Sequence, residues 1–117
     1  MKIALLLPSR NRLNKFLTFL TSVLATTKNI TNVSIILGVD DDDPAFEKYK
    51  RIAKNLEFIK FFPFPKDTFK HGGLSIYWNS MAEMIDHEIL AMVGDDMIFK
   101  TNDWDEVLQA IEEWRNT

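Results

Sequence analysis

Two adjacent carboxylates, Asp95 and Asp96, come directly after a short apolar run over residues 89–93. One of them can face a cleft and bind a hard cation such as Mg²⁺ or Mn²⁺, which takes its other ligands from water and phosphates. The other carboxylate can accept hydrogen bonds from a ribose hydroxyl. The tripeptide that begins at Gly94 is also typical of an ordinary acidic turn, so both interpretations stay open.

A second group of carboxylates, Asp40 to Asp43, follows the apolar residues 33–39. Acidic residues favour helix N-termini, so Asp43 before Pro44 predicts a helix that begins at the proline with Asp43 as its cap. Asp40 differs because it ends the apolar segment directly, where a base or a sugar would arrive. The run lacks the ligand spacing of a calcium-binding loop, and calcium is therefore disfavoured.

A polar turn, Pro8 to Arg12, follows the first apolar run at residues 3–7. It has neither the glycine pattern of a dinucleotide site nor the Lys-Ser/Thr of a P-loop, so both are disfavoured. Ser9 can cap the next helix, and the arginines of the turn can meet a phosphate or the acidic residues. Asn79 lies inside an expected helix where Asn is a poor helix former, and it either faces the cleft or is exposed.

The apolar spacing predicts four strands that alternate with four helices. The expected strands cover residues 3–7, 33–39, 56–62 and 89–93, and the expected helices cover 13–24, 44–53, 74–85 and 104–114. Asp103 and Glu106 are spaced as a capping box for the last helix. The three tryptophans lie at helical spacing and are expected in the core: Trp78, Trp104 and Trp114.

This alternation predicts an α/β fold in three layers, doubly wound and Rossmann-like, with a mostly parallel sheet and helices on both faces. The expected strand order is 3-2-1-4, and ligands of such sheets bind at the carboxyl ends of the strands, near the switch between the first and fourth. The fourth strand is then an edge. Its residues 89–93 are apolar on both faces, which predicts that a partner chain or a further segment covers it, and a homo-oligomer is one way to do so.

Composition narrows the class of protein. With 117 residues, 46% of them hydrophobic, the chain is expected to form one domain over 1–117. The absence of cysteine excludes disulfides, a thiolate nucleophile and sulfur-bound zinc. A net charge of −3 provides no basic field for nucleic acid. The sequence shows no targeting or transmembrane segment, so a cytoplasmic location is expected.

These segments, in this order, resemble the N-terminal, nucleotide-sugar-binding half of the GT-A glycosyltransferases, especially family 2. The resemblance spans nearly the whole chain and is carried by Leu5 to Arg12, Gly38 to Asp40, Trp78-Asn79, Gly94 to Asp96 and Thr101 to Trp104. In that family the turn after the first strand and the acid after the second hold the base and ribose. The resemblance thus implies nucleotide binding by Pro8, Ser9 and Asp40, with Arg12 near the base, and Asn79 is a further candidate for the nucleotide site.

The acidic pair corresponds to the family's Asp-x-Asp signature. The resemblance implies that Asp95 faces the ribose and that Asp96 binds Mn²⁺ or Mg²⁺ on the diphosphate. The implied chemistry is glycosyl transfer from a UDP- or GDP-type sugar to an acceptor, with the metal offsetting charge on the leaving diphosphate. An inverting enzyme also needs a general base. In this family that base comes from the second half, and no residue here matches it, so the catalytic residue is unassigned.

Two alternatives from other classes remain. The first is a non-catalytic nucleotide-sugar-binding or assembly module, a degenerate or truncated relative that binds without transfer. The second is a phosphoacceptor receiver domain, which shares the size and the alternation. Receiver domains place an acidic pair after the first strand, whereas this chain has Pro8-Ser9 there, and this alternative is disfavoured.

Overall fold

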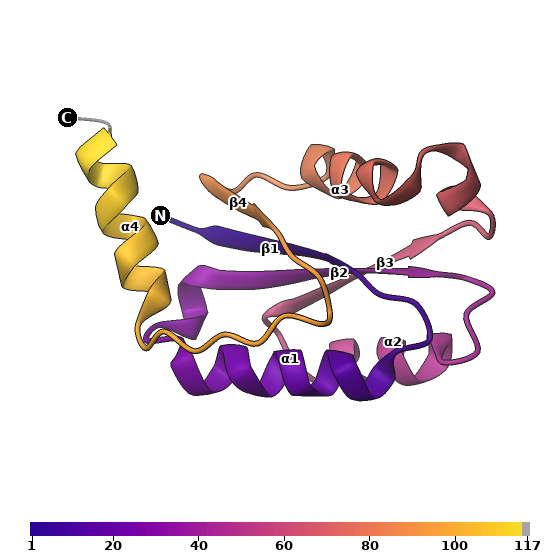
Figure 1. Cartoon of the computed structure of the whole chain (residues 1–117). Coiled ribbons are helices and arrows are strands. Elements are labelled where there is room, and N and C mark those ends of the chain that lie inside the picture. The colour runs from indigo at the N-terminus through magenta and orange to yellow at the C-terminus, as the bar shows by residue number, and fades with distance from the viewer. Residues whose placement is uncertain (116–117) are drawn as a thin grey trace.

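The computed structural model describes residues 1–115 and has one four-stranded parallel sheet between layers of helices (Figure 1). The strands are β1 (Ile3–Pro8), β2 (Val33–Asp40), β3 (Ile59–Phe64) and β4 (Ile89–Met92). The helices are α1 (Leu13–Thr26), α2 (Phe46–Lys54), α3 (Gly73–Glu83) and α4 (Trp104–Arg115), with 3-10 turns η1 (Ile30–Asn32) and η2 (Thr68–His71). The sheet order β3-β2-β1-β4 confirms the predicted α/β class and topology.

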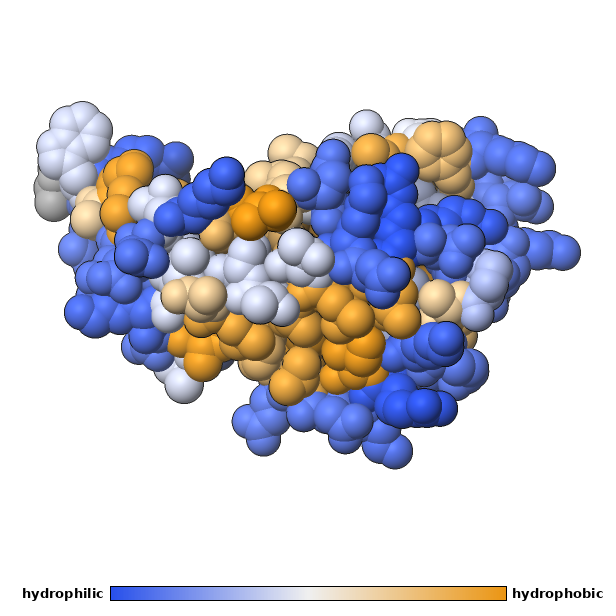
Figure 2. Space-filling model, turned by 60° about the horizontal axis from the view of Figure 1, so that its bottom comes forward, coloured by the Kyte–Doolittle hydropathy of each residue, from blue (hydrophilic) through white to orange (hydrophobic). Residues whose placement is uncertain are grey.

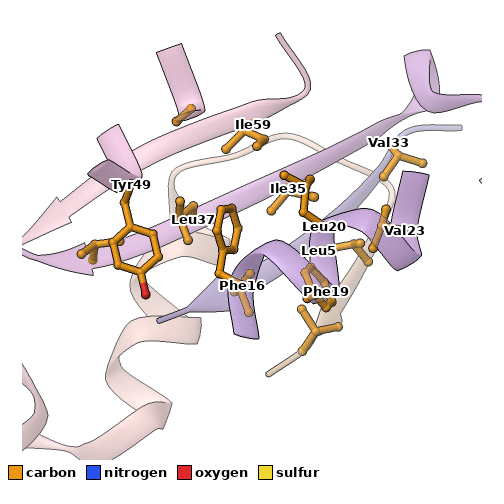
Figure 3. Close-up of a cluster of buried hydrophobic side chains, with 14 of the residues drawn as sticks. Leu5, Phe16, Phe19, Leu20, Val23, Val33, Ile35, Leu37, Tyr49 and Ile59 are labelled. Atoms are coloured by element: carbon orange, nitrogen blue, oxygen red, sulfur yellow. The ribbon is translucent and has the colours of Figure 1, made fainter. Parts of the chain in front are cut away.

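The larger part of the core lies between the sheet and the helices α1 and α2. Residues 3–7 of β1 are all buried, as expected for a central parallel strand with helices on both faces. Figure 3 shows the strand residues Leu5, Ile35 and Leu37 facing the α1 residues Phe16, Phe19 and Leu20. This packing fixes the carboxyl end of β1 over the start of α1.

On the opposite face, α3 packs against Ala4, Leu6 and Ile36 through Tyr77 and Met81. The approach is close because β2 has a glycine there. A Cβ on Gly38 would lie 2.7 Å from the Phe64 ring and 3.1 Å from the Met81 sulfur.

The helix α4 lies beside the amino ends of the strands rather than in either layer (Figure 1). It is held by Asp105, whose side chain is buried at 2% exposure. The two carboxylate oxygens accept hydrogen bonds from the backbone N–H groups of Lys28 and Asn29, each at 2.9 Å. Asp105 therefore ties the start of α4 to the connection between α1 and β2.

The predicted start of α2 is wrong by two residues. The helix begins at Phe46, and Pro44 lies in a turn before it. The Asp43 carboxylate accepts the N–H of Ala45 at 2.8 Å and the N–H of Asn11 at 2.7 Å. Asp43 thus caps a turn and ties it to the β1–α1 loop.

Two expectations for α4 are also wrong. Asp103 has φ of +57°, which is not the extended conformation of a capping residue, and the Glu106 carboxylate instead pairs with Lys28 at 3.5 Å. Trp114 is 79% exposed and therefore lies outside the core. As predicted, Trp104 is buried, and Trp78 is partly buried against the apolar residues between the sheet and α3.

The strand β4 forms one edge of the sheet, as predicted. Leu90 and Met92 are 45% and 65% exposed on the α3 side. The covering partner remains a prediction. A separate apolar surface, shown in Figure 2, lies over α1 and the segment after β4 and includes exposed Leu17 and Ile98.

Within residues 1–115, no helix combines the length and the apolar character that crossing a membrane requires. The cytoplasmic location stays a prediction.

Candidate functional site

A cleft of about 420 Å³ opens where the carboxyl ends of β1, β2 and β4 meet the first turns of α3. This is the position that the doubly wound topology predicts for a ligand. The cleft is lined by Pro8, Ser9, Arg10, Arg12, Asp40, Phe69, Leu74, Tyr77, Trp78, Val93, Gly94, Asp95 and Asp96. Its walls are therefore apolar on the α3 side and charged along the strand ends.

Asp40, at the end of β2, is buried and has partners on both oxygens. Oδ1 accepts a hydrogen bond from the Tyr77 hydroxyl at 2.7 Å, and Oδ2 accepts one from Nη1 of Arg10 at 2.8 Å. The same Arg10 nitrogen reaches Asp42 at 3.1 Å. Burial, with the Asp40 carboxylate beside it, raises the pKa of Tyr77, so its hydroxyl remains a donor.

Asp95, after β4, is also buried and is held from two directions. Its Oδ2 accepts a hydrogen bond from Oγ of Ser9 at 2.8 Å, and its Oδ1 lies 3.5 Å from Nη1 of Arg12. Ser9 is fixed in turn because its N–H donates to the Gly38 carbonyl at 3.0 Å, which continues the β1–β2 ladder beyond Pro8.

Asp96 differs from its neighbour because it is exposed while still lining the cleft. Its Oδ1 lies over the backbone of Gly94, where an added Cβ would come within 2.8 Å of it. No group of three or more His, Cys, Asp or Glu side chains suited to a metal occurs among the described residues. Asp96 is thus an exposed carboxylate at the cleft, and carboxylate oxygens are the type of ligand that Mg²⁺ and Mn²⁺ prefer.

Most of the predicted site residues come together in this cleft: Pro8, Ser9, Arg12, Asp40, Asp95 and Asp96. Asn79 does not, because it is exposed and outside the lining. Successive helical residues differ by about 100° in direction, and in α3 the preceding two positions face the cleft instead. Of these, Trp78 donates its indole N–H to the Leu6 carbonyl at 3.1 Å.

Sequence reasoning missed the lining residues Phe69, Leu74 and Tyr77, and it considered Arg10 only as a partner of the acidic residues or of a phosphate. Arg10 carried a signal, since an arginine between two acid-rich strand ends can pair with either. Tyr77 carried one as well, because it precedes Trp78 on the apolar stripe of α3. Phe69 and Leu74 lie in the loop and first turn after β3, and their approach to the cleft depends on the path of that loop.

No protein-family model matches this sequence, and no curated protein matches it. Solved structures do match. S. aureus TarS 1–349 in complex with UDP-GlcNAc superposes with a TM-score of 0.77 at 16% identity, over 97% of this chain and 32% of that one. TarS 1–349 in complex with UDP gives 0.76 at 17% identity, over 97% and 32%.

TarS is a glycosyltransferase. This chain has a GT-A-like fold. The likeness covers the whole parallel sheet and its helices, and the chain spans about a third of the length of TarS 1–349. At this level of identity the comparison concerns the GT-A-like fold alone.

Proposed function

We propose that the cleft binds a nucleotide-diphosphate sugar and that the chain is the donor-binding part of a glycosyltransferase-like protein. The observation that carries this proposal is the placement of two buried, arginine-paired carboxylates, Asp40 and Asp95, in one cleft at the strand ends. Support also comes from the GT-A-like structures of TarS in complex with UDP and with UDP-GlcNAc. UDP is therefore the first nucleotide to test, and GDP the second.

The base is expected beside Asp40 and Arg10. Nη1 of Arg10 donates hydrogen bonds to Asp40 and Asp42, and the other N–H groups of the guanidinium remain available as donors to a ligand. The pair thus offers donors and a carboxylate acceptor side by side. Uracil presents two carbonyl acceptors that flank one N–H donor, which matches this arrangement. The neighbouring apolar wall of Phe69 and Trp78 covers a flat ring.

Asp95 is expected to bind the ribose, and Asp96 is expected to bind the cation that accompanies the diphosphate. The Oδ1 of Asp95 faces Arg12 and the cleft, where a ribose hydroxyl can donate to it. Asp96 is the residue that would hold Mn²⁺ or Mg²⁺ together with the diphosphate. When bound, such a cation supplies Lewis-acid stabilisation of charge on the leaving group. Arg12, half-exposed at the same edge, adds positive charge near the phosphates.

Calorimetric titration of UDP and GDP, each with and without Mn²⁺, tests the proposal. Binding that Mn²⁺ strengthens, and that Asp96→Ala weakens by about tenfold or more, supports it. Asp86→Ala is the matched control, because Asp86 is an exposed acid outside the cleft lining, and it should bind as the wild type does. Absence of binding to either nucleotide, or binding indifferent to Asp96→Ala, contradicts the proposal.

A second candidate is a binding or assembly module that does not transfer sugar. Its support is that the buried acids of the cleft, Asp40 and Asp95, are already engaged by Arg10 and Arg12. A general base needs a carboxylate able to take a proton from an acceptor hydroxyl. Incubation with UDP-GlcNAc separates the two: release of UDP indicates turnover, whereas binding without release favours the module.

A further inference from the structure

Tyr49 has a buried hydroxyl group that contacts residues of the cleft but has no role in the site proposed above. Tyr49 lies on α2, fully buried, with its ring 5.5 Å from that of Phe16. It is not part of the cleft lining. Figure 3 shows its oxygen as the one red atom in a cluster of apolar side chains. A polar atom there needs hydrogen-bond partners, and its partners belong to the cleft.

The hydrogen bonds around Tyr49 have a single consistent direction. The backbone N–H of Arg12 donates to the Tyr49 oxygen at 3.0 Å. Ser9 donates its one hydroxyl proton to the Asp95 carboxylate, because an ionised carboxylate only accepts. The remaining 2.8 Å bond between Tyr49 and Ser9 must then run from Tyr49 to Ser9. The chain of donors is Arg12 to Tyr49 to Ser9 to Asp95.

We infer that Tyr49 is a positioning residue for nucleotide binding, acting through Ser9 on Asp95. This inference rests on the proposed function. By filling the acceptor site of Ser9, Tyr49 leaves the Ser9 proton for Oδ2 of Asp95 and holds Oδ1 toward Arg12 and the cleft. It also anchors the backbone of Arg12, whose guanidinium meets the same carboxylate. One buried hydroxyl thereby fixes three cleft residues.

The surroundings keep this hydroxyl a donor. Burial raises the pKa of Tyr49, so it stays protonated over the working range of pH. Tyr77 offers the natural comparison. Its hydroxyl is also buried and also donates to a cleft acid, but to Asp40 at the other end of the site.

The test is a double-mutant cycle on UDP affinity. Tyr49→Phe removes one oxygen and keeps the ring, and it should weaken UDP binding about fivefold, as expected for one buried hydrogen bond. In a Ser9→Ala background the same substitution should weaken UDP binding by clearly less than about fivefold, because Tyr49 then acts only through the Arg12 backbone and no longer through Ser9 on Asp95. Tyr77→Phe should weaken UDP binding by the same factor with and without Ser9→Ala, since Tyr77 acts on Asp40 and not through Ser9.

A spectroscopic readout separates positioning from loss of fold. In the ligand-free protein, Tyr49→Phe should move the side-chain carboxyl ¹³C resonance of Asp95 and not that of Asp40, and Tyr77→Phe should do the reverse. Wild-type affinity in Tyr49→Phe, an equal cost in both backgrounds, or an unmoved Asp95 resonance overturns the inference. If the wild type itself fails to bind UDP, the proposed function fails, which is a different result from binding that ignores Tyr49.

Discussion

The Tyr77 hydroxyl donates a 2.7 Å hydrogen bond to Asp40, a residue 37 positions earlier, and so joins α3 to the end of β2 at the floor of the cleft. The Tyr77 ring packs edge-on against Phe64 at 4.8 Å. Phe64 in turn occupies the space that Gly38 leaves open. The position of a cleft acid thus depends on ring packing behind it.

Tyr77→Phe should keep the ring contacts and remove one partner of a buried carboxylate. We expect a loss of about 1–3 kcal/mol in the free energy of unfolding, because Asp40 would then keep only Arg10. Urea denaturation measures this loss. A variant as stable as the wild type would mean that the bond is not formed in solution.

Gly38→Ala should be strongly destabilising. The added methyl would lie 2.7 Å from a ring carbon of Phe64, and that ring is confined by Tyr77. Overpacking of this kind costs about 1–3 kcal/mol. Gly72→Ala is the control in thermal unfolding: its φ of 174° suits any residue, and its nearest contact is a side chain at 3.3 Å. Equal losses in the two variants would contradict the explanation.

Asp105→Ala should detach the start of α4 from the loop before β2. The variant loses two 2.9 Å hydrogen bonds and leaves the N–H groups of Lys28 and Asn29 without their acceptor. A loss of about 2–4 kcal/mol is expected, with faster amide exchange at those two residues. Glu113→Ala, at an exposed position of the same helix, should change neither. Unchanged exchange at Lys28 and Asn29 in the Asp105 variant would argue against this link.

Stability should depend on pH through His87. Its Nε2 lies 3.2 Å from Oγ of Ser34, and burial lowers the pKa of His87 from its ordinary 6.5, helped by Lys2 and Lys60. The unfolded chain therefore binds this proton more readily than the folded one. The stabilisation is complete above about pH 6.5 and is lost as pH falls from there toward the folded-state pKa.

Urea denaturation between pH 5 and 8 checks this dependence. His87→Gln should flatten the decline below about pH 6.5, whereas His71→Gln, at an exposed position in η2, should leave it as in the wild type. A decline that persists unchanged in His87→Gln would assign it to other groups.

The hydrophobic pattern of the sequence was enough to predict the strand order and about half of the residues that line the cleft. Short apolar runs alternating with helical spacing gave the order 3-2-1-4, and that order alone brings Ser9, Asp40 and Asp95 to one edge. Residues that lie directly at strand ends are placed by the sheet, so their positions do not depend on side-chain detail. The apolar faces of α1 and α3 likewise followed from their period.

What could not be predicted depends on helical phase and on distant partners. A step of one residue along α3 decides that Tyr77 and Trp78 face the cleft and Asn79 does not. The start of α2 moves because Asp43 also binds the N–H of Asn11, 32 positions away. The bonds of Asp105 span more than 70 residues, and no local pattern reveals them.

Amide NMR of the labelled chain during titration with UDP and Mg²⁺ tests the central claim most directly. If the cleft binds the nucleotide, the resonances of Ser9, Arg12, Asp40 and Asp95 should shift together along one saturable curve. Those of Thr18 and Thr21, which lie on α1 outside the cleft lining, should not move. No saturable shift, or shifts confined to residues outside the cleft, would contradict nucleotide binding at this site.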